Sequence, residues 1–304
     1  MKEVAHAALK KVGFEVKRVP RRVPDPVLEY LKGGGIPWSL GYEQAKEKFI
    51  SEVLVNPGLL ELFRRGSELP ERFGVGFDER CVEYPWLLAH LRPGLENILD
   101  AGSTLNYAFI LDHLVFRKKK LHILTLAPES GCFWYKAVSY LYDDLRNIPI
   151  RDGYYDTIAC LSTLEHVGCD NTLFTQNETL REQHPEDFIL VMRELYRVLR
   201  PGGTLFLTVP FGVYRNFGTF QQFDTKLLSR AVEPFGKASA VTETFYRYTA
   251  EGWNVADAVD CADCEYVKWV AAAWLRNEWP DPLPVERDMA AAARAVACVR
   301  LIRG

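Results

Sequence analysis

The sequence of 304 residues lacks any apolar run that approaches the roughly 18 residues a membrane-spanning helix needs. It also lacks an excess of one charge, because 37 basic and 40 acidic side chains leave a formal net charge of −3. This balance gives no overall attraction to nucleic acid or to an anionic membrane. The N-terminal stretch carries several charged side chains and no continuous apolar segment, which argues against a secretory signal. We therefore expect a cytoplasmic protein with no nucleic-acid or membrane partner.

Several motifs of common enzyme classes are also missing. The seven cysteines are odd in number and scattered, as expected for reduced thiols. Cys261 and Cys264 form one Cys-x-x-Cys pair, but a structural zinc site needs four ligands and no second pair exists, so we expect no metal. The set Ser162, His166 and Asp170 lacks the Gly-x-Ser-x-Gly elbow of a hydrolase. The absence of Gly-x-Gly-x-x-Gly argues against a nicotinamide-dependent enzyme.

What the sequence does contain is an alternation of short apolar strands and helix-patterned segments. Strands are predicted over 97–99, 122–126, 156–161 and 204–209. Helices are predicted over 77–91, 107–115 and 187–199. Such alternation is typical of an α/β protein with a doubly wound, mostly parallel sheet. The continuous apolar runs at 156–161 and 204–209 favour strands that are buried on both faces.

Two further parts of the chain carry weaker patterns. Residues 132–140 are compatible with a helix, and 142–145 with the end of a short strand. After Pro210 we expect helices over 224–232 and 267–277 and strands over 238–248 and 295–302.

Residues 1–75 form an extension before the alternation begins. Three prolines within residues 19–26 favour an extended chain, and Gly33–Gly35 provides a flexible joint. Helices are predicted over 41–54 and 59–65. Two interpretations stay open: the extension is a lid over a ligand cleft, or it packs against the core. We place a boundary after residue 75, with one domain over 76–304.

The segment Asn97–Asn106 is the one around which the rest of the chain is organised. Ile98 and Leu99 end a strand, Asp100 stands at its carboxyl end, and Gly102 permits a sharp turn. Backbone N–H groups and the dipole of the following helix can then face a polar or anionic ligand. In an open α/β sheet ligands bind beyond the carboxyl ends of the strands, so we expect the ligand site at this turn.

Four segments, in this order, resemble the class I S-adenosylmethionine-dependent methyltransferases, in particular their small-molecule, type 11-like group. They are Ile98–Gly102, Asp144–Pro149 with Tyr155–Ile158, Ser162–Val167, and Glu194–Leu205. The resemblance implies a Rossmann-like, seven-stranded sheet whose last strand, 295–302, is antiparallel and lies beside strand five. It implies S-adenosylmethionine as the cofactor. It also implies methyl transfer to an O or N atom of a small molecule or biosynthetic intermediate.

The resemblance places the cofactor half over about residues 77–165 and assigns cofactor contacts to nine residues. They are Arg80, Asp100, Ala101, Gly102, Ser103, Thr125, Glu129, Asp144 and Leu145. By this resemblance Asp144 accepts a hydrogen bond from the adenine amine, and Arg80 pairs with the cofactor carboxylate. The alternative for Asp100 is an acid that caps the turn, and the alternative for Arg80 is an intrahelical pair with Glu83.

The first glycine motif is degenerate. Thr104 and Asn106 stand where the family usually has glycine, and Thr125 occupies the position of the acid that binds the ribose hydroxyls. A neutral hydroxyl cannot replace that charge-assisted pair, worth ~1.5–3 kcal/mol per bond. Either Glu129 reaches back, or the cofactor binds more weakly, or the site serves another use. A methyltransferase-fold binding or partner protein that has lost catalysis is therefore the alternative function.

The catalytic candidates are Glu165 and His166, which follow the strand 156–161. An imidazole with a pKa of about 6.5 could take a proton from an amine or a hydroxyl. The alternatives are a histidine that packs near the adenine and a structural Glu165. We expect loops 166–186 and 210–225 to set substrate specificity, and a homodimer is compatible with the sequence. The aromatic side chains of the second loop either wall the cleft or plug the core: Phe211, Tyr214, Phe217, Phe220 and Phe223.

Overall fold

The computed structural model describes residues 24–236 and 240–304. The expected extended segment at 19–26 and the first residues of the strand predicted over 238–248 lie partly outside the described residues. The helices are α2 Pro26–Lys32, α3 Tyr42–Leu54, α4 Pro57–Arg65, α5 Arg80–His90, α6 Ala108–Leu111, α7 Thr172–Thr175, α8 Phe188–Val198, α9 Thr225–Val232, α10 Ala258–Cys261 and α11 Lys268–Arg276. The strands are β1 Glu96–Ala101, β2 Lys119–Thr125, β3 Val138–Tyr142, β4 Tyr155–Leu161, β5 Leu199–Pro210, β6 Arg215–Asn216, β7 Gln221–Gln222, β8 Ala240–Thr249, β9 Gly252–Ala256 and β10 Ala295–Ile302.

The main sheet has eight strands in the order β3-β2-β1-β4-β5-β10-β8-β9. Strands β1 to β5 are parallel, and β10 is antiparallel to both β5 and β8. The predicted position of 295–302 beside strand five is therefore confirmed. The eighth strand, β9, was not predicted, and it pairs with β8 through a tight hairpin at Gly252. Gly252 has a φ of +93°, and a Cβ there would lie 2.4 Å from the carbonyl oxygen of Phe73, so this turn requires glycine.

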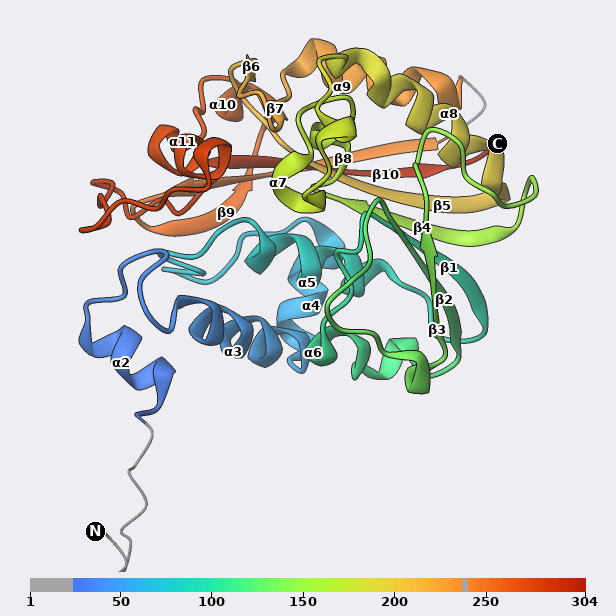
Figure 1. Cartoon of the computed structure of the whole chain (residues 1–304). Helices are drawn as coiled ribbons and strands as arrows, with labels where there is room; N and C mark the ends of the chain where they lie inside the picture. The colour runs from blue at the N-terminus through green and yellow to red at the C-terminus, as the bar shows by residue number, and fades with distance from the viewer. Residues whose placement is uncertain (1–23, 237–239) are drawn as a thin grey trace, which may run out of the picture.

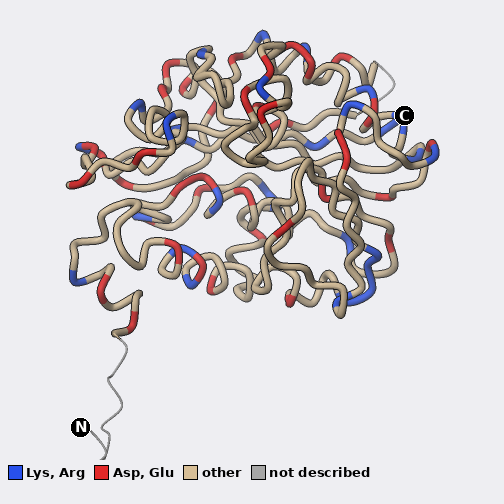
Figure 2. Tube along the Cα trace, viewed as in Figure 1, with Lys and Arg blue, Asp and Glu red and all other residues tan. Residues whose placement is uncertain are grey.

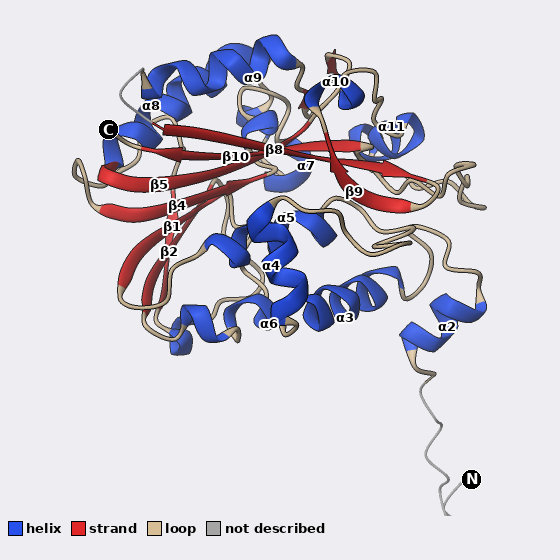
Figure 3. Ribbon diagram, turned by 180° about the vertical axis from the view of Figure 1, so that it is seen from behind, coloured by secondary structure: helices blue, strands red, loops and turns tan. Residues whose placement is uncertain are grey.

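Helices cover both faces of the sheet, as the doubly wound prediction requires (Figures 1 and 3). Helices α3 to α6 lie on one face, where Trp86 and Leu87 of α5 pack in a core with Phe206 of β5. Helices α8 and α9 lie on the opposite face, where Phe188 and Leu195 are fully buried in a second core. The sheet thus separates two hydrophobic cores, one on each face.

The described part of the N-terminal extension packs against the rest of the molecule. Lys46 of α3 forms a buried ion pair with Asp78, at 2.6 Å between Nζ and Oδ2, just before α5. Phe63 of α4 and Phe73 belong to the same hydrophobic core as α5. Trp38 packs edge-to-face against Trp274 of α11, with ring centroids 6.0 Å apart. These contacts hold residues 24–75 against the hydrophobic core around α5.

Most predicted elements agree with the structure apart from a few residues at their ends, but two predictions were wrong. The helix predicted over 107–115 is interrupted, because His113 is extended and its Nδ1 accepts a hydrogen bond from the N–H of Val115, starting a separate 3-10 turn. Helix α6 is only four residues long, so its dipole does not support a ligand site. Residues 132–140 contain a short 3-10 turn followed by β3, which agrees with their aromatic, strand-favouring composition.

Charge and cysteine chemistry agree with the composition. Figure 2 shows the positions of basic and acidic residues interspersed along the Cα trace. Among the described residues, no helix is long and apolar enough to cross a membrane, and no group of three or more His, Cys, Asp or Glu side chains is arranged to hold a metal. All seven cysteines have free thiols.

Candidate functional site

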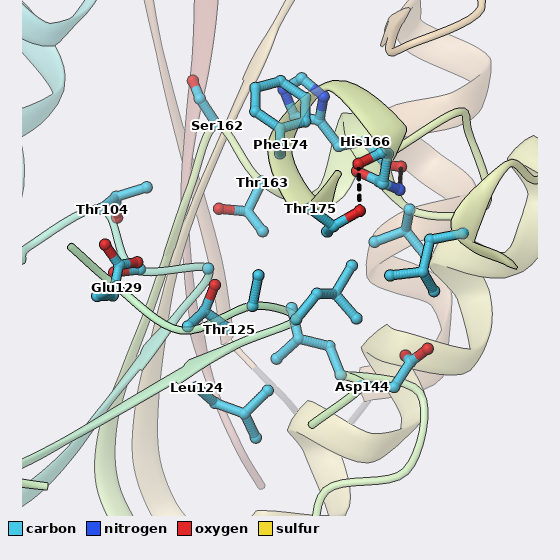
Figure 4. A pocket seen from close by; sticks show the side chains of 18 of the residues that line it. Thr104, Leu124, Thr125, Glu129, Asp144, Ser162, Thr163, His166, Phe174 and Thr175 are labelled. Atoms are coloured by element: carbon cyan, nitrogen blue, oxygen red, sulfur yellow. Dashed lines mark hydrogen bonds between the residues drawn. The ribbon is translucent and has the colours of Figure 1, made fainter. Parts of the chain in front are cut away.

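A cavity of about 470 Å³ opens at the carboxyl ends of β1, β2 and β4 (Figure 4). This volume falls within the ~300–1,000 Å³ typical of small-molecule sites. Its walls come from the turn after β1, the end of β2, the loops after β3 and β4, and Trp274 of α11. The predicted contacts that line it are Arg80, Gly102, Ser103, Thr125, Glu129, Asp144, Leu145 and His166. The strand ends therefore bring most of the sequence-predicted residues to one cavity.

Asp100 holds the turn after β1 rather than facing the cavity. Its side chain is fully buried and accepts hydrogen bonds from Thr104 N, Thr104 Oγ1 and Leu105 N, at 3.2, 3.1 and 2.7 Å. Burial raises the pKa of Asp100 to about 7, although these bonds favour the ionised form. Asp100 and the buried Ala101 are not among the residues that line the cavity. These contacts match the capping alternative for Asp100.

The backbone at Gly102 is special in two ways. Its φ is +116°, and a Cβ there would lie 2.1 Å from Oγ1 of Thr163 in the loop after β4. The next residue, Ser103, also has a left-handed backbone, with φ of 65°. Its Oγ is buried in the cavity wall and has no hydrogen-bond partner among the described residues. An unpaired hydroxyl and a strained turn are features of a site built for a polar ligand.

The two residues that replace glycine leave the cavity open. Thr104 turns its hydroxyl to Asp100, and its carbonyl oxygen accepts a 2.7 Å hydrogen bond from Tyr84. Asn106 turns toward the loop between β2 and β3, where its Nδ2 donates to the carbonyl of Gly131 at 3.0 Å. Asn106 is not among the residues that line the cavity.

Thr125 and Glu129 supply the polar groups at the end of β2. Both line the cavity, and Figure 4 shows them beside Thr104 at the same end of it. No hydrogen bond or ion pair to the Glu129 carboxylate is found between side chains of the described part of the chain. A free carboxylate beside a hydroxyl is suited to bind the two hydroxyls of a sugar.

Asp144 is held by a guanidinium that sequence reasoning missed. Arg146 donates to both oxygens of Asp144 through Nε and Nη2, at 2.6 to 3.1 Å. Arg146 also binds Glu182 and Asp187, at 2.8 and 2.7 Å, in and after the loop that follows β4. Burial acts to raise the pKa of Asp144, but the hydrogen bonds and charge of Arg146 outweigh it and lower that pKa. Asp144 is therefore an ionised acceptor at the cavity wall.

A second missed residue is Glu83, which lies fully buried under the cavity. It accepts hydrogen bonds from Ser162 Oγ at 2.6 Å and from the hydroxyl of Thr208, and it pairs with Arg80 at 2.8 Å. The intrahelical pair considered for Arg80 is thus present, and Arg80 still lines the cavity. The sequence signal was an acid flanked by Val82, Trp86 and other apolar side chains, because a charge on a buried helix face needs partners.

His166 is a neutral imidazole in the cavity wall. Its Nδ1 lies 2.8 Å from the carbonyl oxygen of Thr219, which can only accept, so Nδ1 carries the proton and Nε2 is left as an acceptor. Burial lowers the pKa of His166 to about 4. Its ring packs edge-on against Phe174, with centroids 5.1 Å apart.

Glu165 lies behind the cavity wall and is not among the lining residues. Its side chain is buried, and Oε2 has no hydrogen-bond partner among the described residues. Burial raises its pKa well above the usual value. This carboxyl is therefore an interior group that does not face the cavity, in agreement with the structural alternative.

The two predicted specificity loops have different roles. Asn171, Phe174, Thr175, Leu180 and Glu182 of loop 166–186 line the cavity. No residue of 210–225 lines it. Phe211, Phe220 and Phe223 are fully buried, so the core-plug alternative describes these three side chains, whereas Tyr214 is exposed. Trp274, which sequence reasoning missed, reaches the cavity from α11 and packs on Phe220 with centroids 5.9 Å apart.

Strand order, the antiparallel β10 and the cavity over Gly102 together define the class I methyltransferase fold. Residues 122–207, from β2 into β5, match the family model of the methyltransferase domain. The sequence matches no curated protein.

Three solved structures with a similar fold illustrate the comparison. The 1,6-didemethyltoxoflavin-N1-methyltransferase of Burkholderia thailandensis, solved with S-adenosylhomocysteine, is 15% identical, with 73% of this chain and 77% of that chain covered and a TM-score of 0.42. Geranyl diphosphate C-methyltransferase of Streptomyces coelicolor is 11% identical, with 74% and 79% covered and a TM-score of 0.45. The YcgJ protein of Bacillus subtilis is 11% identical, with 73% and 97% covered and a TM-score of 0.43.

Proposed function

We propose that this protein is an S-adenosylmethionine-dependent methyltransferase that acts on an O or N atom of a small molecule. The observation that carries the proposal is that residues from separate strand ends meet in one cavity. The turn at Gly102, the pair Thr125 and Glu129, the acceptor Asp144 and the imidazole of His166 come from four strand ends and meet in one cavity. A nucleoside with an amino-acid tail needs a tight turn, a diol acceptor and an amine acceptor, and these residues supply them.

The cofactor fits the groups that the chain offers. Gly102 and the unpaired hydroxyl of Ser103 would hold its methionine part, and Arg80 would pair with its carboxylate. The free carboxylate of Glu129, with Thr125, takes the place of the usual ribose-binding acid. Asp144 and Leu145 would hold the adenine. When bound, S-adenosylmethionine supplies a methyl group on a sulfonium, which is already an excellent electrophile.

The remaining work of the protein is to orient the acceptor atom and to accept its proton. The lone pair on Nε2 of His166 can take a hydrogen bond from the O–H or N–H of an acceptor. Since the pKa of His166 is about 4, the imidazole is neutral over the physiological range but is a weak base. We therefore assign it chiefly to orienting the acceptor. Phe174 and Trp274 provide apolar walls at this end of the cavity.

The weak basicity of His166 also favours a second function, a binding or partner protein that keeps the fold without methyl transfer. Such a protein would bind the nucleoside but leave an acceptor's proton in place. Both functions use the same cavity, but only the first transfers a methyl group to an acceptor.

Isothermal titration calorimetry with S-adenosylhomocysteine tests the proposal. We expect a saturable 1:1 heat, about tenfold weaker in Glu129→Gln because a charge-assisted bond is lost. The matched control Glu71→Gln changes an exposed acid away from the cavity and should leave the affinity unchanged. No heat at millimolar ligand would refute cofactor binding. Binding without methyl transfer, in a mass-spectrometric screen of hydroxyl and amine acceptors, would favour the second function.

A further inference from the structure

A second cavity, of about 490 Å³, lies on the face of the sheet that carries α4 and α5. It is bordered by the end of α4, by Trp86 and His90 of α5, and by β8, β9 and Arg300 of β10. It shares no lining residue with the first cavity. The proposed methyltransferase chemistry makes no use of it.

Arg300 is the unusual residue of this cavity. The strand β10 is otherwise apolar, and Arg300 is in register with Phe206 of β5 and Thr242 of β8. Since Phe206 packs against Trp86, the side chain of Arg300 leaves the sheet on the α5 face. Its Nε is buried without a hydrogen-bond partner, and no ion pair within residues 24–236 and 240–304 includes it. A guanidinium with a buried, unpaired N–H is stabilised by an anion.

Further positive charge gathers around Arg300. Arg64 and Arg65 at the end of α4 also line the cavity, and the same single carboxylate, Glu61, pairs with both of them. Burial lowers the pKa of His90, and the nearby charges of Arg300 and Arg64 add to that effect. The cavity therefore has more basic than acidic groups on the side of α4 and α5.

Two acidic residues, Glu243 and Asp257, border the same cavity, and they differ in where their side chains lie relative to Arg300. Glu243 is in register with Val299, which is buried in the core on the opposite face, so the Glu243 side chain leaves the sheet away from Arg300. Asp257, at the start of α10, lies beyond the end of β9 on the rim and has no side-chain capping bond. Asp257 is thus the one acid of this lining expected to oppose an anion.

We propose that this second cavity is a binding site for a small oxyanion, a phosphate or a carboxylate, with Arg300 as its central contact. The planar guanidinium offers paired N–H donors to two oxygens of one ligand group. Arg64 and Arg65 contribute charge at the rim, and the hydroxyl groups of Thr242 and Thr244 border the same face. The volume admits a small molecule that carries such a group.

Calorimetric titration of the full chain with inorganic phosphate, and separately with succinate, at constant ionic strength tests this proposal and distinguishes the two ligand classes. We expect saturable binding of at least one of them. Arg300→Met keeps the apolar stem and should weaken that binding about tenfold. Asp257→Asn should strengthen it about threefold, because a repulsive charge is removed. The control Arg193→Met, an exposed side chain on α8, should leave it unchanged.

Three outcomes would overturn the proposal: no saturable heat with either anion, equal affinity in Arg300→Met and the parent, or a loss of binding in Arg80→Met in place of Arg300→Met. The last result would place the anion in the first cavity. If Arg300→Met does not fold, Arg300→Lys keeps the charge without the paired donors. It should bind about threefold more weakly than the parent, and undiminished affinity there would equally contradict a guanidinium contact.

Discussion

Asp100 and Asp144 both stand near one cavity at the ends of strands, yet they are held in different ways. Asp100 is closed within its own turn by the N–H groups of Thr104 and Leu105. Asp144 is held by Arg146, which at the same time binds Glu182, 36 residues further along the chain. The turn after β1 is therefore preorganised by its local sequence, whereas the opposite wall is assembled from distant segments. We expect the first to tolerate little change and the second to adjust.

The largest effect should come from Gly102→Ala, which attacks the preorganised turn. The new Cβ would meet the side chain of Thr163 at 2.1 Å, at a φ that L-residues rarely adopt. We expect a loss of about 3 kcal/mol in the free energy of unfolding and no measurable binding of S-adenosylhomocysteine. Urea unfolding and calorimetry measure these effects. The control Gly131→Ala has open space around its new methyl group, and comparable damage there would remove the distinction.

His166 belongs to the wall that is assembled from distant segments, and its titration should make the free energy of unfolding depend on pH. The pKa of His166 is lowered to about 4, so its contribution to stability is complete above about pH 6.5 and is lost as the pH falls toward 4. His166→Asn keeps a donor for the carbonyl of Thr219 but cannot titrate. Between pH 7 and pH 4.5 the parent should lose about 2 kcal/mol more than this variant. Urea unfolding at both pH values measures the difference, and parallel losses would mean that His166 is not buried as described.

A smaller effect is expected from Asp144→Ala. Removal of the acceptor should weaken S-adenosylhomocysteine binding by about 1–2 kcal/mol, because a buried adenine amine loses its partner while Arg146 keeps Glu182 and Asp187. The control Asp152→Ala removes an exposed acid that pairs with Arg197. Unchanged affinity in Asp144→Ala, measured by calorimetry, would place the adenine elsewhere.

The smallest effect is expected from Asn106→Ala. The Asn106 side chain donates to the carbonyl of Gly131 in the loop between β2 and β3 and accepts from the hydroxyl of Tyr140 in β3, and it does not line the cavity. Its removal should cost about 0.5–1 kcal/mol of stability and change S-adenosylhomocysteine affinity less than twofold. A tenfold gain in affinity would show that this side chain enters the cavity in solution, and the turn would then be less open than described.

The parts of the fold that depend on local signals could be predicted from the sequence. The apolar runs of β1, β4 and β5 and the turn at Gly102 each lie within a few neighbouring residues. The position of β10 followed from the family resemblance. The prediction of a helix over 107–115 was wrong because His113 has an extended backbone. The spacing of apolar residues does not reveal such a change.

The rest of the site depends on contacts between distant residues. Glu83 meets Ser162 and Thr208, which lie 79 and 125 residues further along the chain. Trp274 reaches the cavity from a helix whose pattern indicates only burial. The aromatic side chains of 211–223 show the converse, because their spacing fits a cavity wall and a core plug equally well, and only packing decides between them.

The central claim is that a nucleoside with an amino-acid tail binds between the turn at Gly102 and the carboxylate of Asp144. A crystal structure of the protein with S-adenosylhomocysteine tests it most directly. We expect the tail against Gly102 and Ser103, the ribose hydroxyls on Glu129 and the adenine amine on Asp144. A ligand bound elsewhere, or in this cavity with its ribose turned away from Glu129, would contradict it.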